Sequence, residues 1–447
     1  MAASTHDIED VEMEGEYSDA MSDSGSGDGI VDISSHGTYL DRVHESLEGL
    51  EEYQDGGYHP VYLGDVLGSR YRVIHKLGHG ESGTIWLCRD THKDSYVAVK
   101  IFTANMAPEN LADLRLAQLD TTALGAGFLA IPMNHFSVQG PNGTHQCIVL
   151  PVLGPCVSPK LWLRIEGDAG PFLRKLAGQA AQAMGFLHKH GICHGDFRPS
   201  NILVKLTNLD HLPEEQILSL IGQPVKIDVH TASRDPLPAS TPQYLVPSAD
   251  MSLLGNECFT DQICVIDFAQ AYPVSSTPAE LSIPECYLPP EVLLRKPNSI
   301  GPACDLWALG CTLFEIRQQI SLFYMVFDED ELLAEMVRLF GRFPEGWWRK
   351  WEASGDFFDE NGRWLGDGDE DDMDGDEKKD GSLEAALGRP VEVVQAGEGE
   401  DETRKRTLVT PVREQRLMAD LLHKLFRYEP GKRIGVDEVL AHEWFRI

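Results

Sequence analysis

The hydrophobic pattern of this chain changes its period near residue 155, and this change limits the folds that the chain can adopt. On the N-terminal side, short runs of β-branched and aromatic residues are separated by glycine or polar turns. Three such runs follow one another from Tyr71, namely YRVIHKLGHG, GTIWLCRD and SYVAVKIF, and HQCIVLPVLG at 145–154 is a fourth. This pattern predicts consecutive antiparallel strands.

On the C-terminal side, apolar residues recur at the spacing of an α-helix. The segment PFLRKLAGQAAQAMGFLHKHG carries one apolar stripe and ends at Gly191, a residue type that commonly stops helices; the stripe comprises Phe172, Leu176, Ala180, Met184 and Leu187. Further helices are predicted in CDLWALGCTLFEIR, ELLAEMVRLFGRF and EQRLMADLLHKLF, and one on the N-terminal side in NLADLRLAQL at 110–119.

These patterns together predict an α+β fold with two lobes. The smaller, N-terminal lobe is an antiparallel β-sheet over about residues 71–153, and the larger, helical lobe covers about 154–447. A stretch at 206–261, rich in Pro, Ser and Asp, does not fit this outline and is predicted to be an insertion.

The chain has 71 acidic and 38 basic residues, for a net charge of −33, and the acidic excess is concentrated in two segments. Like-charge blocks of low hydrophobicity are usually disordered. We therefore predict an acidic disordered tail over 1–57 and a second, acidic insertion over 354–404. Because phosphate repels such segments, we expect no direct binding of nucleic acid.

The sequence contains no apolar run of about 18 residues, and its acidic start lacks the basic and apolar regions of a secretory signal. We therefore expect no membrane association. Nine cysteines are scattered without a CxxC pair, which favours reduced thiols over a disulfide framework or a zinc site. We expect a monomer in the cytoplasm and nucleus.

The first motif with chemical content is LGHGESGTIWL, in which Gly78, Gly80 and Gly83 have GxGxxG spacing. Alone this is a weak signal, since glycines between strands are often only turn residues. In a dinucleotide-binding fold the motif opens a helix, whereas here the residues from Thr84 to Leu87 continue as a strand. The arrangement favours a hairpin over ATP, with backbone N–H groups close to the phosphates.

Lys100 ends the apolar run Val97-Ala98-Val99. A lysine in this position directs its ammonium group toward the interior, where it requires an anion. The phosphates of ATP supply one. A surface lysine at a strand end is the alternative, and the glycine motif that precedes Lys100 makes this alternative less favourable.

The segment HGDFRPSNIL combines Asp196, Arg198 and Asn201 in a loop between an apolar helix and a strand. Asp196 can present a carboxylate to a substrate hydroxyl, Asn201 an amide oxygen to a metal, and Arg198 can neutralise charge that develops on a γ-phosphate. In CVIDFA, Asp267 ends an apolar strand, a common position for a fixed Mg²⁺ ligand. No single motif is specific, but their order predicts ATP and Mg²⁺ as cofactors.

With these motifs in this order, the chain resembles the eukaryotic protein kinase superfamily over about residues 71–447, apart from the insertions. The segment YLGDVLGSRYRVIHKLGHGESGTIWLCRD is similar to the start of SR-protein kinases, especially their short filamentous-fungal members. The insertion between Asn201 and Asp267 lies where these kinases carry a spacer. FPEGWWRKWEASGDFFDENGRW is also similar to the C-lobe of the fungal members.

The resemblance implies roles for single residues. Lys100 would bind the α- and β-phosphates, Asp196 would accept the substrate hydroxyl proton, and Asn201 and Asp267 would hold the metal. Leu150 matches the gatekeeper, and backbone groups of Pro151 and Leu153 would meet the adenine edge. The implied nucleotide contacts are Leu77, Gly78, His79, Gly80, Gly83, Ile85, Ala98, Lys100, Asp113, Leu150, Pro151 and Leu153.

The resemblance also implies two contacts within the C-lobe. Glu291, at the end of the activation segment, would pair with Arg433, and Asp305 would brace the catalytic loop from a buried helix.

Four residues depart from the common kinase pattern. Asp113 stands where the partner of Lys100 is normally Glu, and Glu109 is a less suitable alternative. Ser82 replaces a Phe at the loop tip, so we expect a less well anchored loop. Gly195 replaces the Arg that receives an activation-loop phosphate, so no such switch is expected. Ala269 replaces a Gly after Asp-Phe, which restricts that segment.

The expected function is transfer of phosphate from ATP to Ser or Thr in proteins, and the resemblance implies substrates that are basic or rich in Arg and Ser. Two alternatives remain open. One is an ATP-binding pseudokinase scaffold, which Asp113 favours. The other is a small-molecule kinase of the aminoglycoside or choline type, whose motifs are similar to HGDFRPSN and VIDFA.

Overall fold

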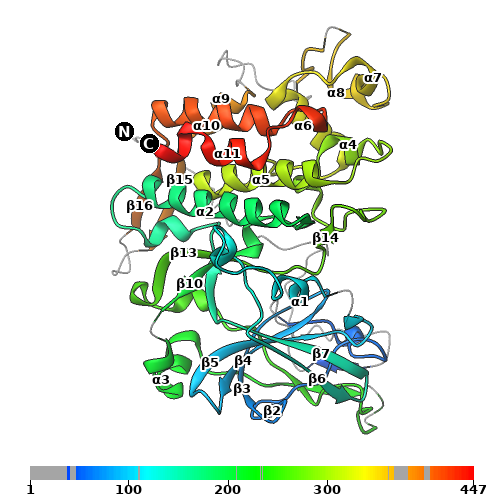
Figure 1. Cartoon of the computed structure of the whole chain (residues 1–447), viewed down its shortest axis with the longest axis vertical. Coiled ribbons are helices and arrows are strands. Elements are labelled where there is room, and N and C mark those ends of the chain that lie inside the picture. Colours follow the sequence, from blue (N-terminus) through cyan, green and yellow to red (C-terminus); the bar gives the residue numbers. More distant parts are fainter. Residues whose placement is uncertain are drawn as a thin grey trace, which may run out of the picture.

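The structure, a computed structural model, describes residues 38–40, 47–108, 111–207, 209–231, 233, 235–360, 362–366, 381–396 and 403–447. Two lobes lie one above the other in Figure 1, with the large β-sheet at the bottom and most helices at the top. The predicted α+β fold with a β N-lobe and a helical C-lobe is confirmed.

The N-lobe is built on one six-stranded sheet in the order β2-β3-β4-β5-β7-β6, with antiparallel neighbours throughout. Side chains alternate between its faces, so Val97, Val99 and Ile101 of β5 pack on one face and Ala98 and Phe102 on the other. The same alternation puts Lys100 on the face that looks toward the C-lobe. The strands are β2 (Val66–Leu67), β3 (Tyr71–Gly80), β4 (Gly83–Asp90), β5 (Ser95–Phe102), β6 (Asn134–Gly140) and β7 (Gly143–Leu150).

The helix after β5 is shorter than the prediction of 110–119. Helix α1 covers Ala112–Leu116, and turns follow it. After Leu116 the backbone continues in turns, with bonds from the Gln118 N–H to the Arg115 oxygen and from the Leu119 N–H to the Leu116 oxygen. The side chain of Asp120 then accepts hydrogen bonds from the backbone N–H and the hydroxyl of Thr122, which forms a further local turn. Glu109, the alternative partner of Lys100, lies outside the described residues.

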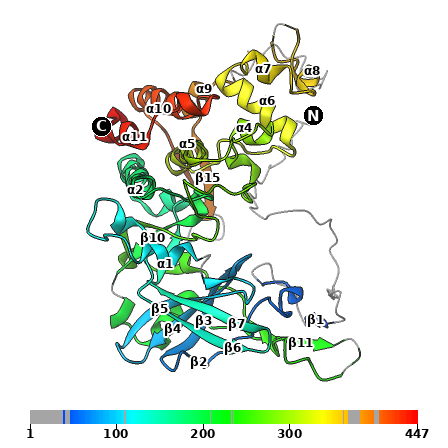
Figure 2. The ribbon, with the colours of Figure 1, turned by 45° about the vertical axis from the view of Figure 1, so that its right-hand side comes forward.

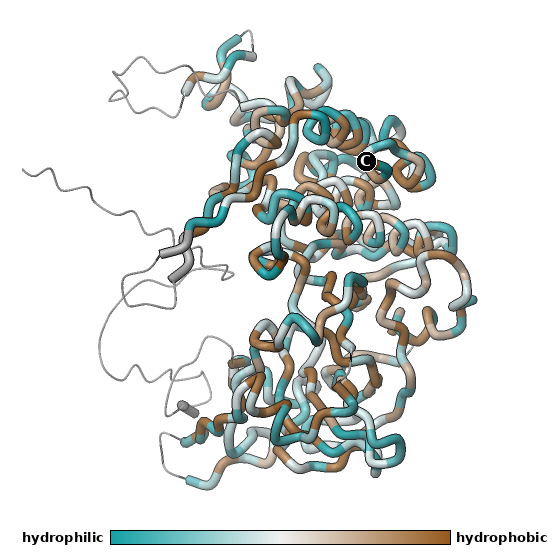
Figure 3. Tube along the Cα trace, turned by 90° about the vertical axis from the view of Figure 1, so that its left-hand side faces the viewer, coloured by the Kyte–Doolittle hydropathy of each residue, from teal (hydrophilic) through white to brown (hydrophobic). Residues whose placement is uncertain are grey.

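The C-lobe is centred on α2 (Gly170–Lys189) and α5 (Pro302–Gln318), which pack against each other. The predicted stripe of α2 is buried from Leu176 to Leu187, whereas Phe172 is only half-buried. Figure 3 shows teal and brown residues side by side along the helices of the C-lobe. Helix α2 has half-buried and exposed residues on one side, whereas α5 is buried on all sides from Cys304 to Gln318. The other helices of the lobe are α4 (Pro290–Leu293), α6 (Glu329–Phe340), α7 (Glu345–Trp348), α10 (Val412–Leu425) and α11 (Val436–Ala441).

Two short ladders lie in the part of the C-lobe nearest the N-lobe in Figure 1. Strands β13 (Phe259–Val265), β10 (Ile202–Leu206) and β8 (Leu153–Cys156) form one small sheet in that order, and β14 (Tyr272–Pro273) pairs with β9 (Ile192–Cys193). Ile202 faces Val265 in the first ladder. This register brings Asn201, just before β10, close to Asp267, just after β13.

The N-terminal segment and the first insertion fold together beside the N-lobe sheet, where Figure 2 shows β1 and β11. Strand β1 (Thr38–Leu40) pairs with β11 (Ile227–Thr231), which also pairs with β12 (Tyr244–Leu245). The insertion also contains α3 (Glu214–Ile221). Leu206 of β10 still pairs with Phe259 of β13, so the predicted boundaries at 206 and 261 fall inside strands.

Residues 47–57 correct the predicted boundary of the acidic tail. Leu50 and Tyr53 are buried in one cluster with Val229 and Leu245 of the insertion. Glu48 is buried too and pairs with Lys76 of β3. A few apolar residues among many acids are sufficient for this packing, because the insertion supplies the rest of the cluster. The tail prediction for 1–37 and 41–46 lies outside the described residues.

The described parts of the second insertion are integrated into the C-lobe. Leu383 and Leu387 of α9 (Leu383–Gly388) are fully buried in its core. Near α8 (Ser354–Phe357), Phe358 packs against Trp351 and Trp364. The hairpin of β15 (Val391–Ala396) and β16 (Thr403–Leu408) closes this stretch. Residues 367–380 and 397–402 lie outside the description.

Within the described ranges, no helix has both the length and the apolar character needed to cross a bilayer. All nine cysteines are free thiols.

Candidate active site

A cavity of about 750 Å³ lies between the lobes. The predicted contacts that line it are Leu77, Ile85, Ala98, Lys100, Asp113, Leu150, Pro151 and Leu153, together with the predicted metal ligand Asp267. The lining does not include Gly78, His79, Gly80 or Gly83, which lie in the β3–β4 hairpin, nor Asp196, Arg198 or Asn201, although Ser200 of the same loop is part of it.

Apolar side chains line the part of the cavity next to residues 150–153, where the chain passes from β7 to β8. Ala98 faces Leu150 across the β5–β7 ladder, and Leu203 and Ile266 belong to the same packed cluster. A flat, largely apolar ring such as adenine suits these walls. Pro151 has no N–H and offers only its carbonyl to the ring edge.

Lys100 and Asp267 form an ion pair at the polar end of the cavity. Lys100 Nζ donates a hydrogen bond of 2.8 Å to Asp267 Oδ1. Lys100 is nearly buried, while 39% of the Asp267 side chain is exposed. Burial acts to raise the pKa of Asp267, but the charge of Lys100 outweighs it, and the pKa lies below its usual value. Asp267 is therefore an ionised carboxylate with a face open to the cavity.

The expected pair between Lys100 and Asp113 is not formed, which corrects that prediction. Asp113 lines the cavity and is buried, but within the described part of the chain no hydrogen-bond donor reaches its Oδ2. Burial raises the pKa of Asp113, although nearby Lys100 opposes the shift. The side chain is one methylene shorter than Glu and stands on a helix of five residues, so it does not reach an ammonium group already bound by Asp267.

The catalytic-loop residues contact one another closely. Arg198 Nε donates to Asp196 Oδ1 at 3.0 Å, and Asn201 Nδ2 donates to Asp196 Oδ2 at 2.7 Å. These two donors orient the Asp196 carboxylate. Because the amide nitrogen of Asn201 is engaged, its amide oxygen is the group able to bind a cation. The Ile266 N–H also donates to the backbone oxygen of Asn201 at 2.9 Å, which links this loop to the Asp267 segment.

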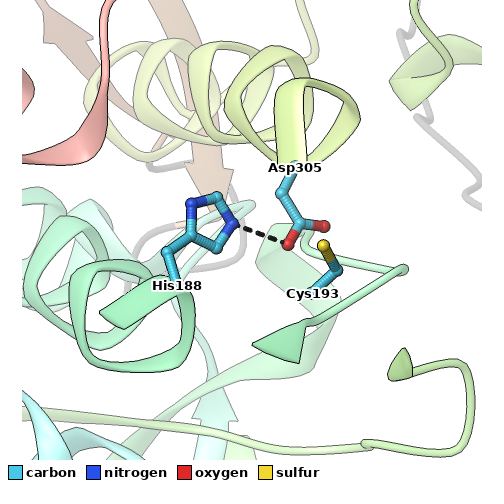
Figure 4. A group of neighbouring side chains, drawn as sticks. All are labelled: His188, Cys193 and Asp305. Atoms are coloured by element: carbon cyan, nitrogen blue, oxygen red, sulfur yellow. Dashed lines mark hydrogen bonds and ion pairs between the residues drawn. The ribbon is translucent and has the colours of Figure 1, made fainter. Parts of the chain in front are cut away.

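Asp305 braces the catalytic loop from α5, as the resemblance implies. Its Oδ2 accepts from the backbone N–H of His194 at 2.8 Å, and its Oδ1 accepts from that of Gly195 at 3.0 Å. Figure 4 shows Asp305 with His188, which bonds Oδ2 at 3.0 Å, and with Cys193.

His188, Cys193 and Asp305 place possible metal-ligand atoms within 4.8 Å of one another. Both oxygens of Asp305 already accept hydrogen bonds from the loop backbone. Burial also raises the pKa of the Cys193 thiol to about 12, so it stays protonated at neutral pH. We interpret the group as a structural support of the loop.

Gly195 has a conformation that suits glycine alone. Its φ is +79°, and a Cβ at this position would overlap the carbonyl oxygen of Gln270. Gln270, near the start of the activation segment, therefore lies directly against the backbone of the catalytic loop. No side chain fits where the common kinase pattern has an Arg.

Below the activation segment, Arg433 binds Glu291 through two hydrogen bonds, as the resemblance implies. Tyr287, in the same segment, donates a hydrogen bond of 2.6 Å to buried Glu315 of α5. These contacts fix the end of the segment to the helical core and leave its middle, including Ser275 and Ser276, exposed.

Comparison with known proteins agrees with this geometry. The model of the protein kinase domain matches residues 253–445. This match shows a protein kinase domain in the C-terminal part of the chain. A Ser/Thr protein kinase of Aspergillus fumigatus is 25% identical over 92% of this chain and 94% of its own length. The Ser/Thr-protein kinase spk-1 of Caenorhabditis elegans is 34% identical over 45% of this chain, and human SRSF protein kinase 3 is 34% identical over 36%.

These relatives support the SR-protein kinase-like branch of the family. The matched region spans only 21% of the C. elegans protein and 30% of the human protein. Of these three relatives, the fungal kinase is matched over most of its own length.

Sequence reasoning missed one wall of the cavity. Residues Ala249, Asp250, Met251 and Ser252 of the first insertion line it, and the Ala249 N–H donates to the Lys76 backbone oxygen at 2.9 Å. These residues form no motif, so nothing in the sequence indicates the contact. Leu203 and Ile266 were also missed as lining residues, although each lies within a recognised motif, HGDFRPSNIL and CVIDFA.

Proposed function

We propose that this kinase transfers the γ-phosphate of ATP to Ser or Thr residues of proteins. The observation that carries the proposal is the convergence of two pairs. Asp196 is held by Asn201 in the catalytic loop, and the adjoining strand delivers Asp267 to Lys100 at the polar end of the cavity.

Each residue of the two pairs has a role in this reaction. Asp196 accepts the proton of the substrate hydroxyl, and Arg198, which holds its carboxylate, lies where it can meet charge on the transferred phosphoryl group. Lys100 would hold the α- and β-phosphates. The amide oxygen of Asn201 and the open face of Asp267 suit Mg²⁺, which prefers oxygen ligands. Bound Mg²⁺ would neutralise charge on the phosphates.

We also propose that the substrates are rich in Arg and Ser. A relative is named SRSF protein kinase 3, and a net charge of −33 attracts cationic segments. The test compares initial rates on an Arg-Ser repeat peptide and on an acidic Ser peptide of equal length, with MgATP. A higher kcat/KM for the Arg-Ser peptide is expected, and a preference for the acidic peptide would contradict the proposed substrate class.

A second candidate, an ATP-binding scaffold without catalysis, is favoured by one observation, the absence of a bond between Asp113 and Lys100. A scaffold would bind nucleotide, detected as a rise in melting temperature, and show equal background transfer for wild type and Asp196→Asn. The small-molecule kinase alternative receives no such support, since the Glu291–Arg433 pair belongs to the peptide platform that the resemblance implies.

We further propose a monomer that acts in the cytoplasm and nucleus and does not bind nucleic acid directly. Nine free thiols and the acidic charge support this. Light scattering after gel filtration, imaging of a fluorescent fusion and a gel shift with RNA test the three parts. A dimer, exclusion from both compartments or a shifted RNA band would each contradict one of them.

A further inference from the structure

The glycine loop between β3 and β4 is held from outside its own hairpin. Tyr58 donates a hydrogen bond of 2.7 Å from its phenol to the backbone oxygen of Gly80. On the other side of the tip, the Thr103 N–H donates to the Ser82 oxygen at 3.1 Å. Both bonds use carbonyl oxygens, so neither occupies a loop N–H. The loop is thus anchored despite Ser82 in place of an aromatic residue.

Tyr58 is itself fixed by several contacts. The residue is 4% exposed, and its ring meets that of Tyr53 edge to face, with 5.6 Å between the ring centroids. Asn142 Nδ2 donates to the Tyr58 backbone oxygen at 2.7 Å. The Ala104 N–H donates to the oxygen of neighbouring Gly57 at 3.0 Å. A phenol held at so many points can define the position of the group that it binds.

The same N-terminal segment also holds the strand that leads into the loop. Glu48 forms a fully buried ion pair with Lys76, two residues before Gly78. The backbone oxygen of Lys76 is bound in turn by the Ala249 N–H of the first insertion. The N-terminal segment and the insertion therefore fix β3 through both its side chain and its backbone, and Tyr58 extends this support to the loop tip.

We propose that Tyr58 is a positioning residue for the nucleotide: its phenol holds Gly80 so that the loop N–H groups stay directed at the phosphates. Tyr58 does not touch the nucleotide itself. The proposal rests on the proposed function, because ATP is the ligand that the loop receives.

The test is Tyr58→Phe, which removes one hydroxyl and keeps the ring packing. Three quantities are measured: the Kd of ADP by calorimetry, KM for ATP and kcat with a Ser peptide, and amide hydrogen exchange of residues 78–84 in the nucleotide-free protein. We expect Kd and KM to rise about three- to tenfold, the effect of one lost hydrogen bond, with kcat changed less than about twofold. Exchange of the loop amides should accelerate.

The matched control is Tyr62→Phe. The Tyr62 hydroxyl accepts a bond from Gln243 N–H in the same region and does not contact the loop. This variant should leave Kd and loop exchange unchanged. The positioning role is wrong if Tyr58→Phe also leaves the Kd of ADP and the loop exchange unchanged. It is equally wrong if the two variants alter these quantities to the same extent. Failure of the proposed function has another signature, since wild type then binds ADP but transfers no phosphate, and binding and exchange still decide the role of Tyr58.

Discussion

Arg433 and Glu291 form a buried pair with two hydrogen bonds of 2.6 Å each, and at most 1% of either side chain is exposed. Arg433 also donates to the backbone oxygens of Arg427, Ala303 and Tyr428. The pair joins the end of the activation segment to the last part of the chain, so its loss leaves an uncompensated charge in the core.

Glu291→Gln should therefore lower the free energy of unfolding by about 3–5 kcal/mol. Equilibrium unfolding in urea measures it. Glu329→Gln is the control, because the Glu329 side chain is half-exposed and lies 3.9 Å from an exposed Arg295. That change should cost less than about 1 kcal/mol. Equal losses of unfolding free energy in the two variants would show that the buried pair stabilises the fold no more than the exposed one.

Asp113 should contribute little to catalysis, because Lys100 is bound by Asp267. We expect Asp113→Asn to lower kcat/KM less than about fivefold, whereas Lys100→Met should lower it at least about a hundredfold. Asn keeps the shape of the Asp113 side chain and replaces a buried carboxyl group whose pKa is already raised by burial. Steady-state kinetics with varied ATP measure both. If Asp113→Asn is as damaging as Lys100→Met, the two residues pair during turnover.

Gly195→Ala should destabilise the catalytic loop more than Gly191→Ala. Both glycines have positive φ, +79° and +70°, so both variants incur strain of about 1–2 kcal/mol. Only at Gly195 does the added Cβ overlap a neighbouring carbonyl, whereas the space at Gly191 is open. The difference between the two losses of unfolding free energy isolates this overlap. A smaller loss at Gly195 would mean that the activation segment does not rest on the loop.

The protein should lose stability in mild acid through His59. Burial and the neighbouring His145 lower the pKa of His59 from 6.5 to about 4. Between these values the unfolded chain binds a proton that the folded chain does not, so stability falls as pH drops through this window. His59→Gln removes the effect and should reduce the loss between pH 7 and pH 5 by about 1–2 kcal/mol. Urea unfolding at both pH values measures it, with exposed His92→Gln as control; identical losses in all three proteins would contradict the assignment.

The sequence was a good guide wherever one local pattern decided the outcome. Lys100 reaches the cavity because β5 alternates, and Asp196 and Asp267 follow elements with clear apolar periods. The Glu291–Arg433 pair and the support from Asp305 came from the resemblance, not from periodicity. Both kinds of expectation concern residues whose surroundings are set by regular elements.

Contacts between distant, irregular segments could not be predicted. Asp113 does not pair with Lys100 because Lys100 donates to Asp267, a residue 167 positions further along the chain, and the sequence gives no sign of this contact. Residues 47–57 look like a solvated acidic stretch until Val229 and Leu245 complete their cluster. The bond between Tyr58 and Gly80 likewise depends on a segment that has no motif.

The central claim is that Asp196 activates a substrate hydroxyl in a working protein kinase. The most direct measurement is the rate of γ-phosphate incorporation into an Arg-Ser repeat peptide at saturating MgATP, for wild type and for Asp196→Asn. The Asn side chain keeps the shape of Asp196 but cannot accept the proton of the substrate hydroxyl. It also receives a weaker hydrogen bond from Arg198. We predict robust transfer by wild type and a fall of about 10²- to 10⁴-fold in the variant. Equal, background-level rates for the two proteins would contradict the account.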